Sequence, residues 1–210
     1  MVTFALAKYL HEKGFSTKEV VFAIHTFRGA ASGGTLATAL GLFGKYSLGQ
    51  VAHSMNPSSI CPISLPNQLS PPSLMTSISG LRIVPNLGTL TTSIQGGPDI
   101  PIVYRSWGLL SSVGAEEFYG PDFQFSPYVS VRNAFVGVLV HVAVTLLPIL
   151  LAFPPLRWAL AKVVLQPGQG PSREESKSHV LEYRAVGIPN TQTHQRAYAR
   201  MRWEGKISTN

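Results

Sequence analysis

The longest apolar pattern in the chain runs from Ala134 to Phe153, AFVGVLVHVAVTLLPILLAF, and contains no charged residue. As an α-helix with a rise of about 1.5 Å per residue it would be roughly 30 Å long, close to the thickness of a bilayer's hydrocarbon core. His141, Thr145 and Pro148 interrupt the pattern, and a proline inside a helix predicts a kink. The pattern predicts a helix in contact with a membrane, either spanning it or dipping into it. A buried core helix is the alternative.

A shorter amphipathic pattern follows at once. Pro154 and Pro155 predict a bend, and residues 156–165 alternate between apolar and basic positions at helical spacing. Basic residues and tryptophan are typical of the boundary between lipid and water. The predicted membrane-interface residues are therefore Arg132, Arg157, Trp158 and Lys162.

The N-terminal third predicts a helix, a strand and a second helix. Residues 1–13 place their apolar side chains on one helical face, and Gly14 is suited to end that helix. Because this helix begins without a capping residue, we expect sequence to have preceded it. Residues 19–29, EVVFAIHTFRG, are rich in β-branched and aromatic side chains and predict a buried strand. Residues 36–46 predict the second helix.

The middle of the chain is less regular. Residues 47–80 contain five prolines among serines and asparagines and predict a long irregular loop. Residues 81–85, 88–94 and 100–110 predict strands, with turns at Pro85-Asn86 and at residues 96–99. Residues 122–126 predict a short aromatic segment that leads to the apolar helix.

The C-terminal part predicts a β-hairpin. Ser172 and Glu175 are spaced as a capping box, and residues 180–186 and 196–204 predict the two strands. In the second strand, alternation places Tyr198, Arg200 and Arg202 on one face. No recognised nucleic-acid-binding module surrounds this basic face, so we expect no nucleic-acid partner.

Together these elements predict an α+β fold with a mixed or antiparallel sheet, flanking helices and one apolar membrane-type helix. The strands come from residues 20–28, 81–110 and 180–204, and the helices from residues 3–13, 35–46 and 134–165. We expect residues 1–130 to form a substrate-side part, residues 131–166 to associate with a membrane, and residues 167–210 to complete the sheet. An open sheet edge predicts pairing with a second copy of the chain.

Composition, net charge and cysteine content limit the classes of protein to which the chain can belong. Of 210 residues, 45% are hydrophobic and 13% charged, which excludes a disordered charged tail. The net charge is +7, and most of the basic excess follows the apolar stretch, so the positive-inside rule places the C-terminal tail on the cytosolic face. With one cysteine, Cys61, no disulfide can form within the chain. The first residues do not match a signal peptide.

Candidate chemistry lies in two places. The turn RGAASGGT leads from a predicted strand into a predicted helix, where free N–H groups could contact a cofactor or substrate. Its candidate residues are Ser32, Gly33, Gly34 and Thr35, with a tight packing turn as the alternative. Arg105 beside Trp107 could hold a phosphate or carboxylate, or could simply stack at a sheet edge.

Other sites are not predicted. The chain contains neither GxGxxG nor a P-loop, and its His and Cys spacing matches no metal site. The adjacent carboxylates Glu116 and Glu117 are more typical of a solvated loop than of catalysis.

Several stretches resemble one enzyme family, the saccharopine dehydrogenase-like oxidoreductases, which include the trans-acting enoyl reductases and lipid-droplet relatives. The segments that carry the resemblance occur in the family's order and cover nearly the whole chain: RGAASGGTLATAL (28–40), RSWGL (105–109), FYGPDFQFS (118–126), FPPLRWALAKVVLQPGQGPSREE (153–175) and EYRAVGIP (182–189). The resemblance is to the C-terminal half of the family. The nucleotide-binding Rossmann half, with its GxGxxG, has no counterpart here.

The resemblance implies an NAD(P)-dependent oxidoreductase of lipid or glycolipid metabolism, attached to the cytosolic face of a lipid droplet, the endoplasmic reticulum or a mitochondrial membrane. NAD(P) would bind the part of the family that is missing here, so we expect this chain alone to bind no cofactor and to be inactive. The implied partners are a lipid surface and a lipid-like substrate. The alternative function is that of a non-catalytic protein that binds or scaffolds at a lipid surface.

Overall fold

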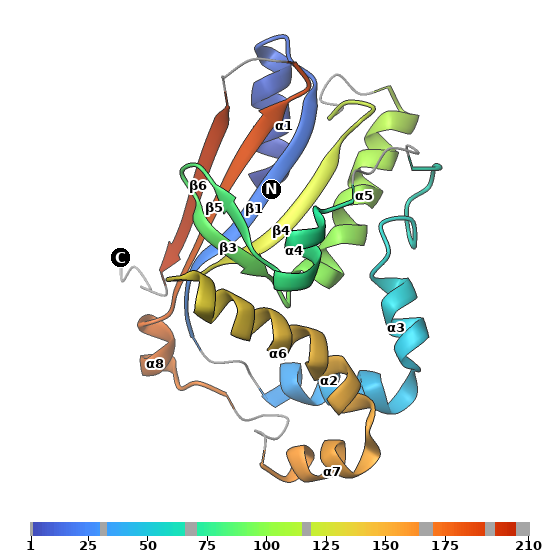
Figure 1. The fold of residues 1–210 in the computed structure, drawn as a ribbon, viewed down its shortest axis with the longest axis vertical. Helices are drawn as coiled ribbons and strands as arrows, with labels where there is room; N and C mark the ends of the chain where they lie inside the picture. Colours follow the sequence, from blue (N-terminus) through green and yellow to red (C-terminus); the bar gives the residue numbers. More distant parts are fainter. Residues whose placement is uncertain are drawn as a thin grey trace.

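The computed structural model describes residues 2–29, 33–65, 71–114, 119–163, 170–191 and 196–204. It is an α+β fold: a six-stranded mixed sheet with helices on its faces and below it (Figure 1). The helices are α1 (Val2–Glu12), α2 (Gly33–Lys45), α3 (Leu48–Ser54), α4 (Leu74–Ser79), α5 (Gly96–Ser112), α6 (Ala134–Ala152), α7 (Pro154–Val163) and α8 (Arg173–Lys177). The strands are β1 (Thr17–Arg28), β2 (Arg82–Val84), β3 (Gly88–Thr92), β4 (Gln124–Ser130), β5 (Val180–Pro189) and β6 (Ala197–Glu204).

The sheet has the order β2-β3-β4-β1-β5-β6. Only β1 and β4 pair in parallel, with Val21 opposite Ser126; the other neighbours are antiparallel. The long central strand β1 is apolar on both faces because both faces are covered. Its pairing with β5 and the β5–β6 hairpin confirm the predicted C-terminal strands, although β5 continues through residues 187–189, beyond the predicted end at residue 186.

Two apolar clusters hold the layers together. Behind the sheet, α1 and α5 bury Leu6, Leu10, Tyr104 and Trp107 against β1, β4 and β5. In front, the β2–β3 hairpin turns over the sheet and covers the other face of β1 (Figure 1). That front cluster consists of Val21, Ala23, Val84, Leu87, Leu90 and Val186.

The predicted strand at residues 100–110 is wrong, because this segment is the middle of α5. Its β-branched and aromatic residues suggested a strand, but the buried positions Pro101, Tyr104 and Gly108 are spaced three or four apart, as in a helix. The residues predicted as a turn, 96–99, are the first turn of α5. Tertiary packing decides here: the Tyr104 hydroxyl accepts a hydrogen bond from the backbone N–H of Phe125 in β4.

The predicted irregular loop at residues 47–80 contains two short helices. Ser47 and Gln50 form a reciprocal capping box at the start of α3, and Ser73 caps α4. The signal was present in the sequence as Ser-x-x-Gln, but the surrounding prolines obscured it. The second predicted capping box, Ser172 with Glu175, is confirmed at α8.

The basic face of the hairpin is ion-paired within the sheet. Glu182, whose side chain is only 3% exposed, accepts hydrogen bonds from Arg184 and Arg200, and Arg202 lies 3.7 Å from the same carboxylate. Burial alone would raise the pKa of Glu182, but the two arginine hydrogen bonds and charges lower it below its ordinary value of 4.5. The alternation predicted for β6 therefore positions its arginines around one carboxylate.

Glu182→Gln is expected to destabilise the fold, because three arginines would lose their shared counter-charge. The glutamate is charged in the native protein at neutral pH, so the loss of stability should be complete above about pH 5 and shrink as the pH falls through the lowered pKa. The measurement is the urea midpoint at neutral and acidic pH. Glu174→Gln, which removes only an exposed pair with Lys177, is the matched control and should leave the midpoint unchanged. Equal midpoints for both variants would contradict this assignment.

Candidate functional site

A polar cleft of about 670 Å³ lies between the front of the sheet, α4 and α6, a volume in the range of small-molecule sites. Glu19 of β1, Ser126 and Tyr128 of β4, Arg82 of β2 and Thr92 of β3 all line it. His141 contributes from α6, Thr76 and Ser77 from α4, and Ser73 from the N-cap of α4. Elements far apart in the sequence thus meet at this place.

An ion pair forms one wall of the cleft. Both guanidinium Nη atoms of Arg82 donate to the two carboxylate oxygens of Glu19, one of them at 2.8 Å, and the Ser126 hydroxyl donates to the same carboxylate. The guanidinium also lies 5.7 Å from the centre of the Tyr128 ring. Burial would raise the pKa of Glu19, but the hydrogen bonds from Arg82 and Ser126 and the Arg82 charge lower it below 4.5. Both partners are therefore charged at neutral pH.

A histidine on the apolar helix forms another wall. The Nδ1 atom of His141 lies 2.7 Å from the Thr92 hydroxyl, and its ring packs on Gly80, where an added Cβ would approach ring atoms within 2.5 Å. Gly80 has φ +70°, the left-handed conformation that ends α4. Its lack of a Cβ leaves room for the ring. The histidine in the apolar stretch is thus accounted for, because its ring contacts β3 and Gly80.

The apolar helix itself is two-sided. It contacts β3, α2, α3, α4 and α7. The Thr91 hydroxyl donates to the carbonyl of Gly137 at 2.7 Å, and only Gly137 and Leu151 are fully buried. The outer side exposes a stripe of large apolar residues spaced three or four apart, which we call the apolar stripe: Phe135, Leu139, Val142, Leu146, Ile149 and Phe153.

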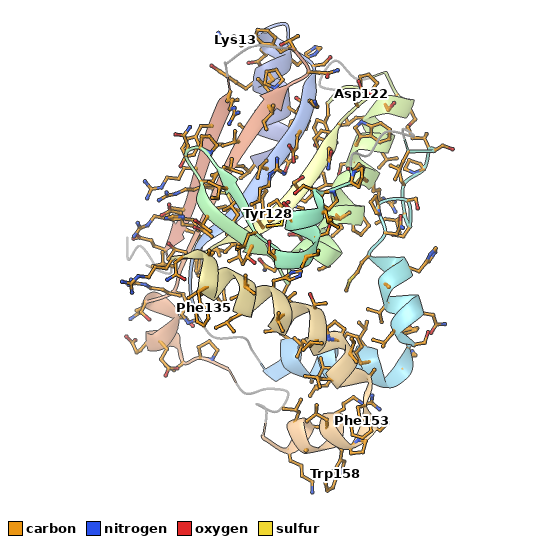
Figure 2. The ribbon with its side chains drawn as sticks, viewed as in Figure 1. Lys13, Asp122, Tyr128, Phe135, Phe153 and Trp158 are labelled. Atoms are coloured by element: carbon orange, nitrogen blue, oxygen red, sulfur yellow. The ribbon has the colours of Figure 1, made fainter. Side chains whose placement is uncertain are left out.

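The predicted membrane-interface residues lie around this helix. Arg132 is exposed just before α6, and Trp158 is exposed on α7, with the Lys162 Nζ atom 3.4 Å from the centre of its ring. Figure 2 places Phe135 near one end of α6, and Phe153 and Trp158 at the base of the molecule. Arg157 has a structural position instead: its Nη1 donates to the carbonyls of Phe43 and Leu151, where α2 and α6 end.

The other predicted site residues are not brought together. Ser32 lies outside the described residues, as do Glu116 and Glu117. Gly33, Gly34 and Thr35 begin α2, at the base of the molecule. Arg105 is exposed on α5, whereas Trp107 on the same helix is buried and donates its indole N–H to the carbonyl of Gly120 at 2.9 Å.

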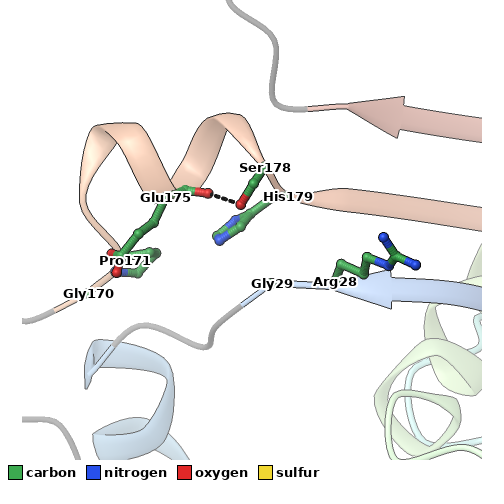
Figure 3. Close-up of a pocket in the computed structure, with 7 residues that line it drawn as sticks. All are labelled: Arg28, Gly29, Gly170, Pro171, Glu175, Ser178 and His179. Atoms are coloured by element: carbon green, nitrogen blue, oxygen red, sulfur yellow. Dashed lines mark hydrogen bonds between the residues drawn. The ribbon is translucent and has the colours of Figure 1, made fainter.

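A second hollow lies where β1 and α8 end. It measures about 660 Å³ and is lined by Arg28, Gly29, Gly170, Pro171, Glu175, Ser178 and His179 (Figure 3). The Ser178 hydroxyl donates to the backbone carbonyl of Glu175, while the Glu175 carboxylate accepts a hydrogen bond from the backbone N–H of Ser172. These polar groups mainly hold α8 in place. Nowhere in the described part of the chain do three or more His, Cys, Asp or Glu side chains gather as a metal site.

Comparison of the chain with protein-family models, with curated proteins and with solved structures finds no match. The resemblance to saccharopine dehydrogenase-like oxidoreductases therefore stays a prediction. The site rests on geometry alone: a polar cleft directly beside a helix whose outer side is apolar and exposed.

Proposed function

We propose that this chain attaches to a lipid surface through α6 and α7 and offers the polar cleft to a lipid-like ligand. The apolar stripe carries the proposal. It belongs to the one described helix that is long and apolar enough to cross a membrane, yet only 11% of its most apolar window is buried. Phe135 is 73% exposed and Leu139 55%. So large an apolar patch on a protein surface is typical of an interaction site.

The contacts of α6 favour a position in the plane of one leaflet over a transmembrane one. Gly137 and His141 bind Thr91 and Thr92 of β3, and α2 and α4 also contact the helix. If α6 crossed the bilayer while keeping these contacts, it would carry the polar cleft into the hydrocarbon, which is costly. An in-plane helix buries its apolar side at the boundary between headgroups and acyl chains and leaves the other side on the protein.

Depth measurements test this orientation. In a Cys61→Ser background, a fluorophore is attached to a single cysteine at Phe135, Val142 or Ile149, and quenching by lipids brominated at different depths is recorded. An in-plane helix gives the same shallow depth at all three positions. A deep value at Val142 between two shallow ones would indicate a spanning helix, and no quenching at any position would overturn attachment itself.

Basic residues at the two ends of the apolar stripe should strengthen binding to anionic lipids. Arg132→Gln with Lys162→Gln is expected to weaken binding to phosphatidylserine-containing vesicles by roughly thirtyfold and to leave binding to neutral vesicles nearly unchanged, since each cation near an anionic surface contributes about 1 kcal/mol. Vesicle flotation at low salt measures both.

The matched control replaces two lysines at the far end of the molecule. Lys8→Gln in α1 with Lys13→Gln just after it makes the same change in charge, and Lys13 lies at the end of the molecule opposite Trp158 (Figure 2). An equal loss of binding in the control would mean that net charge, rather than the position of the basic residues, governs attachment.

The family resemblance adds a second element to this proposal. If it holds, the cleft is the substrate side of an NAD(P)-dependent oxidoreductase whose nucleotide-binding part lies outside this sequence. The size and the convergent polar groups of the cleft favour this version, whereas a non-catalytic lipid-surface protein needs only α6 and α7. The mass of the endogenous protein separates the two: a species of roughly twice 22.7 kDa supports the oxidoreductase, and one of 22.7 kDa supports the non-catalytic protein.

A further inference from the structure

The cleft has a distinctive balance of charge. Among the described residues that line it, Arg82 is the only arginine or lysine and Glu19 the only carboxylate, and they neutralise each other through a two-point hydrogen-bonded pair. The Ser126 hydroxyl and the Tyr128 ring occupy further sides of this pair. An anionic ligand would have to compete with a carboxylate that the fold already holds against the guanidinium.

The remaining polar side chains are hydroxyls, the Gln124 carboxamide and an imidazole. The lining includes Thr92 and Ser93 at the end of β3, Ser73, Thr76 and Ser77 at the start of α4, and His141 of α6. Hydroxyls both donate and accept hydrogen bonds, so they match hydroxyl and carbonyl oxygens of a ligand. Apolar groups, among them Ile100 and Phe125, complete the lining.

The short helix α4 has polar residues toward the cleft and apolar residues exposed on its surface. Its polar residues, Ser73, Thr76 and Ser77, line the cleft, whereas Leu74, Met75 and Ile78 are 76%, 75% and 69% exposed. The same helix packs against α6. Helix α4 therefore separates the polar residues of the cleft from a strongly apolar exposed surface, and it does so beside α6, which carries the apolar stripe.

We propose that the cleft receives the uncharged head of an acyl lipid, one that bears hydroxyl or carbonyl oxygens, and that the Glu19–Arg82 pair disfavours anionic heads. This inference rests on the proposed function, because it assumes that α6 and α4 lie at a lipid surface from which the lipid enters. Thr92 and His141 would bind the head, and the apolar exterior of α4 would contact the acyl chains.

The test uses two water-soluble probes, so that binding in the cleft is measured without a membrane. Dihexanoylglycerol has an uncharged head, and dihexanoyl phosphatidate has the same acyl chains with a phosphate. Calorimetric titration of the full chain should give at least about tenfold tighter binding of dihexanoylglycerol, and the His141 ring resonances should shift on binding. Equal or tighter binding of the phosphatidate, or no binding of dihexanoylglycerol, would overturn the proposal.

Two variants sharpen the test. Glu19→Gln leaves the Arg82 charge uncompensated and should reverse the preference toward the phosphatidate. Thr92→Val removes one hydroxyl with almost no change in shape and should weaken dihexanoylglycerol binding several-fold, while the melting temperature falls by only a few degrees because the hydrogen bond to His141 is also lost. An unchanged affinity in Thr92→Val overturns the assignment of the cleft even if Glu19→Gln does not fold. Vesicle flotation of the same samples reports on surface attachment separately, so a failure of the cleft and a failure of attachment are distinguishable.

Discussion

Replacing Leu139 and Leu146 together with aspartate is expected to release the chain from vesicles. Both side chains lie on the apolar stripe and are about half exposed. Each would lose roughly 1 kcal/mol of apolar burial in the lipid, and each new carboxylate would add the cost of entering the headgroup boundary. Together these effects exceed about 3 kcal/mol, which corresponds to a loss of more than a hundredfold in the partition coefficient.

Flotation on a density gradient measures this loss, and α5 offers a matched control. Ile102 and Leu109 have the same spacing as Leu139 and Leu146 and are similarly exposed, but they lie on α5, behind the sheet. Ile102→Asp with Leu109→Asp changes charge and apolarity equally and should float like the unaltered chain. Because exposed positions tolerate substitution, both double variants should keep nearly the original melting temperature. Flotation of the α6 variant, or loss of the α5 variant, would contradict the assignment of the apolar stripe.

The apolar helix could be predicted because its signal is local. A run of uncharged residues of this length is typical of a helix that contacts a membrane or lies in a protein core, and α6 begins and ends within one residue of the predicted bounds. What the sequence could not reveal is the inner side of the helix. His141 stands out in the sequence as an imperfection of the apolar run, and only the packing of β3 against α6 gives it partners.

The errors elsewhere arise where tertiary contacts override local preference. Residues 100–110 contain β-branched and aromatic residues, yet Tyr104 and Trp107 bury together on one helical side of α5. The predicted contact residues Arg105 and Trp107 were chosen on the assumption of a strand. On a helix, two such positions point in different directions, so the pair separates into an exposed arginine and a buried tryptophan.

The cleft itself was missed for a physical reason. Its ion pair joins residues 63 positions apart, and the register that aligns Ser126 with β1 comes from a parallel pairing between distant strands. No sequence motif predicts such a site, because none of the contributing residues is unusual in its own segment. An isolated glutamate at the start of the apolar strand β1 was the one available signal, because burial of a charge demands a partner.

Removing the negative charge of Glu19 should have the second large effect that we expect. Glu19→Gln should lower the free energy of unfolding by about 2 kcal/mol at neutral pH, because Arg82 keeps its charge in a partly enclosed place without a counter-ion. Side-chain exposures of 14% for Glu19 and 28% for Arg82 keep the effect below that of a fully buried pair. For a chain of this size the melting temperature should fall by roughly 4–8 °C.

The direction in which the effect of Glu19→Gln changes with pH follows from the pKa of Glu19. Since the pKa of Glu19 is lowered in the folded chain, its contribution is fully present above the ordinary value of 4.5 and is lost as the pH falls through the lowered one. The gap between the original chain and Glu19→Gln should therefore be widest near neutrality and close as the pH falls below the lowered pKa. Arg82 stays protonated throughout this range, so it adds no pH dependence of its own.

A double-mutant cycle isolates the coupling between the two residues. Arg82→Met alone should be destabilising because it leaves the Glu19 carboxylate without its partner, whereas Glu19→Gln with Arg82→Met should recover part of the loss. Thermal unfolding at several pH values measures all four proteins. Additive losses, or a gap that does not change with pH, would mean that the pair does not hold the β2–β3 hairpin against the sheet. The cleft would then lack the neutral wall on which its preference for uncharged lipid heads depends.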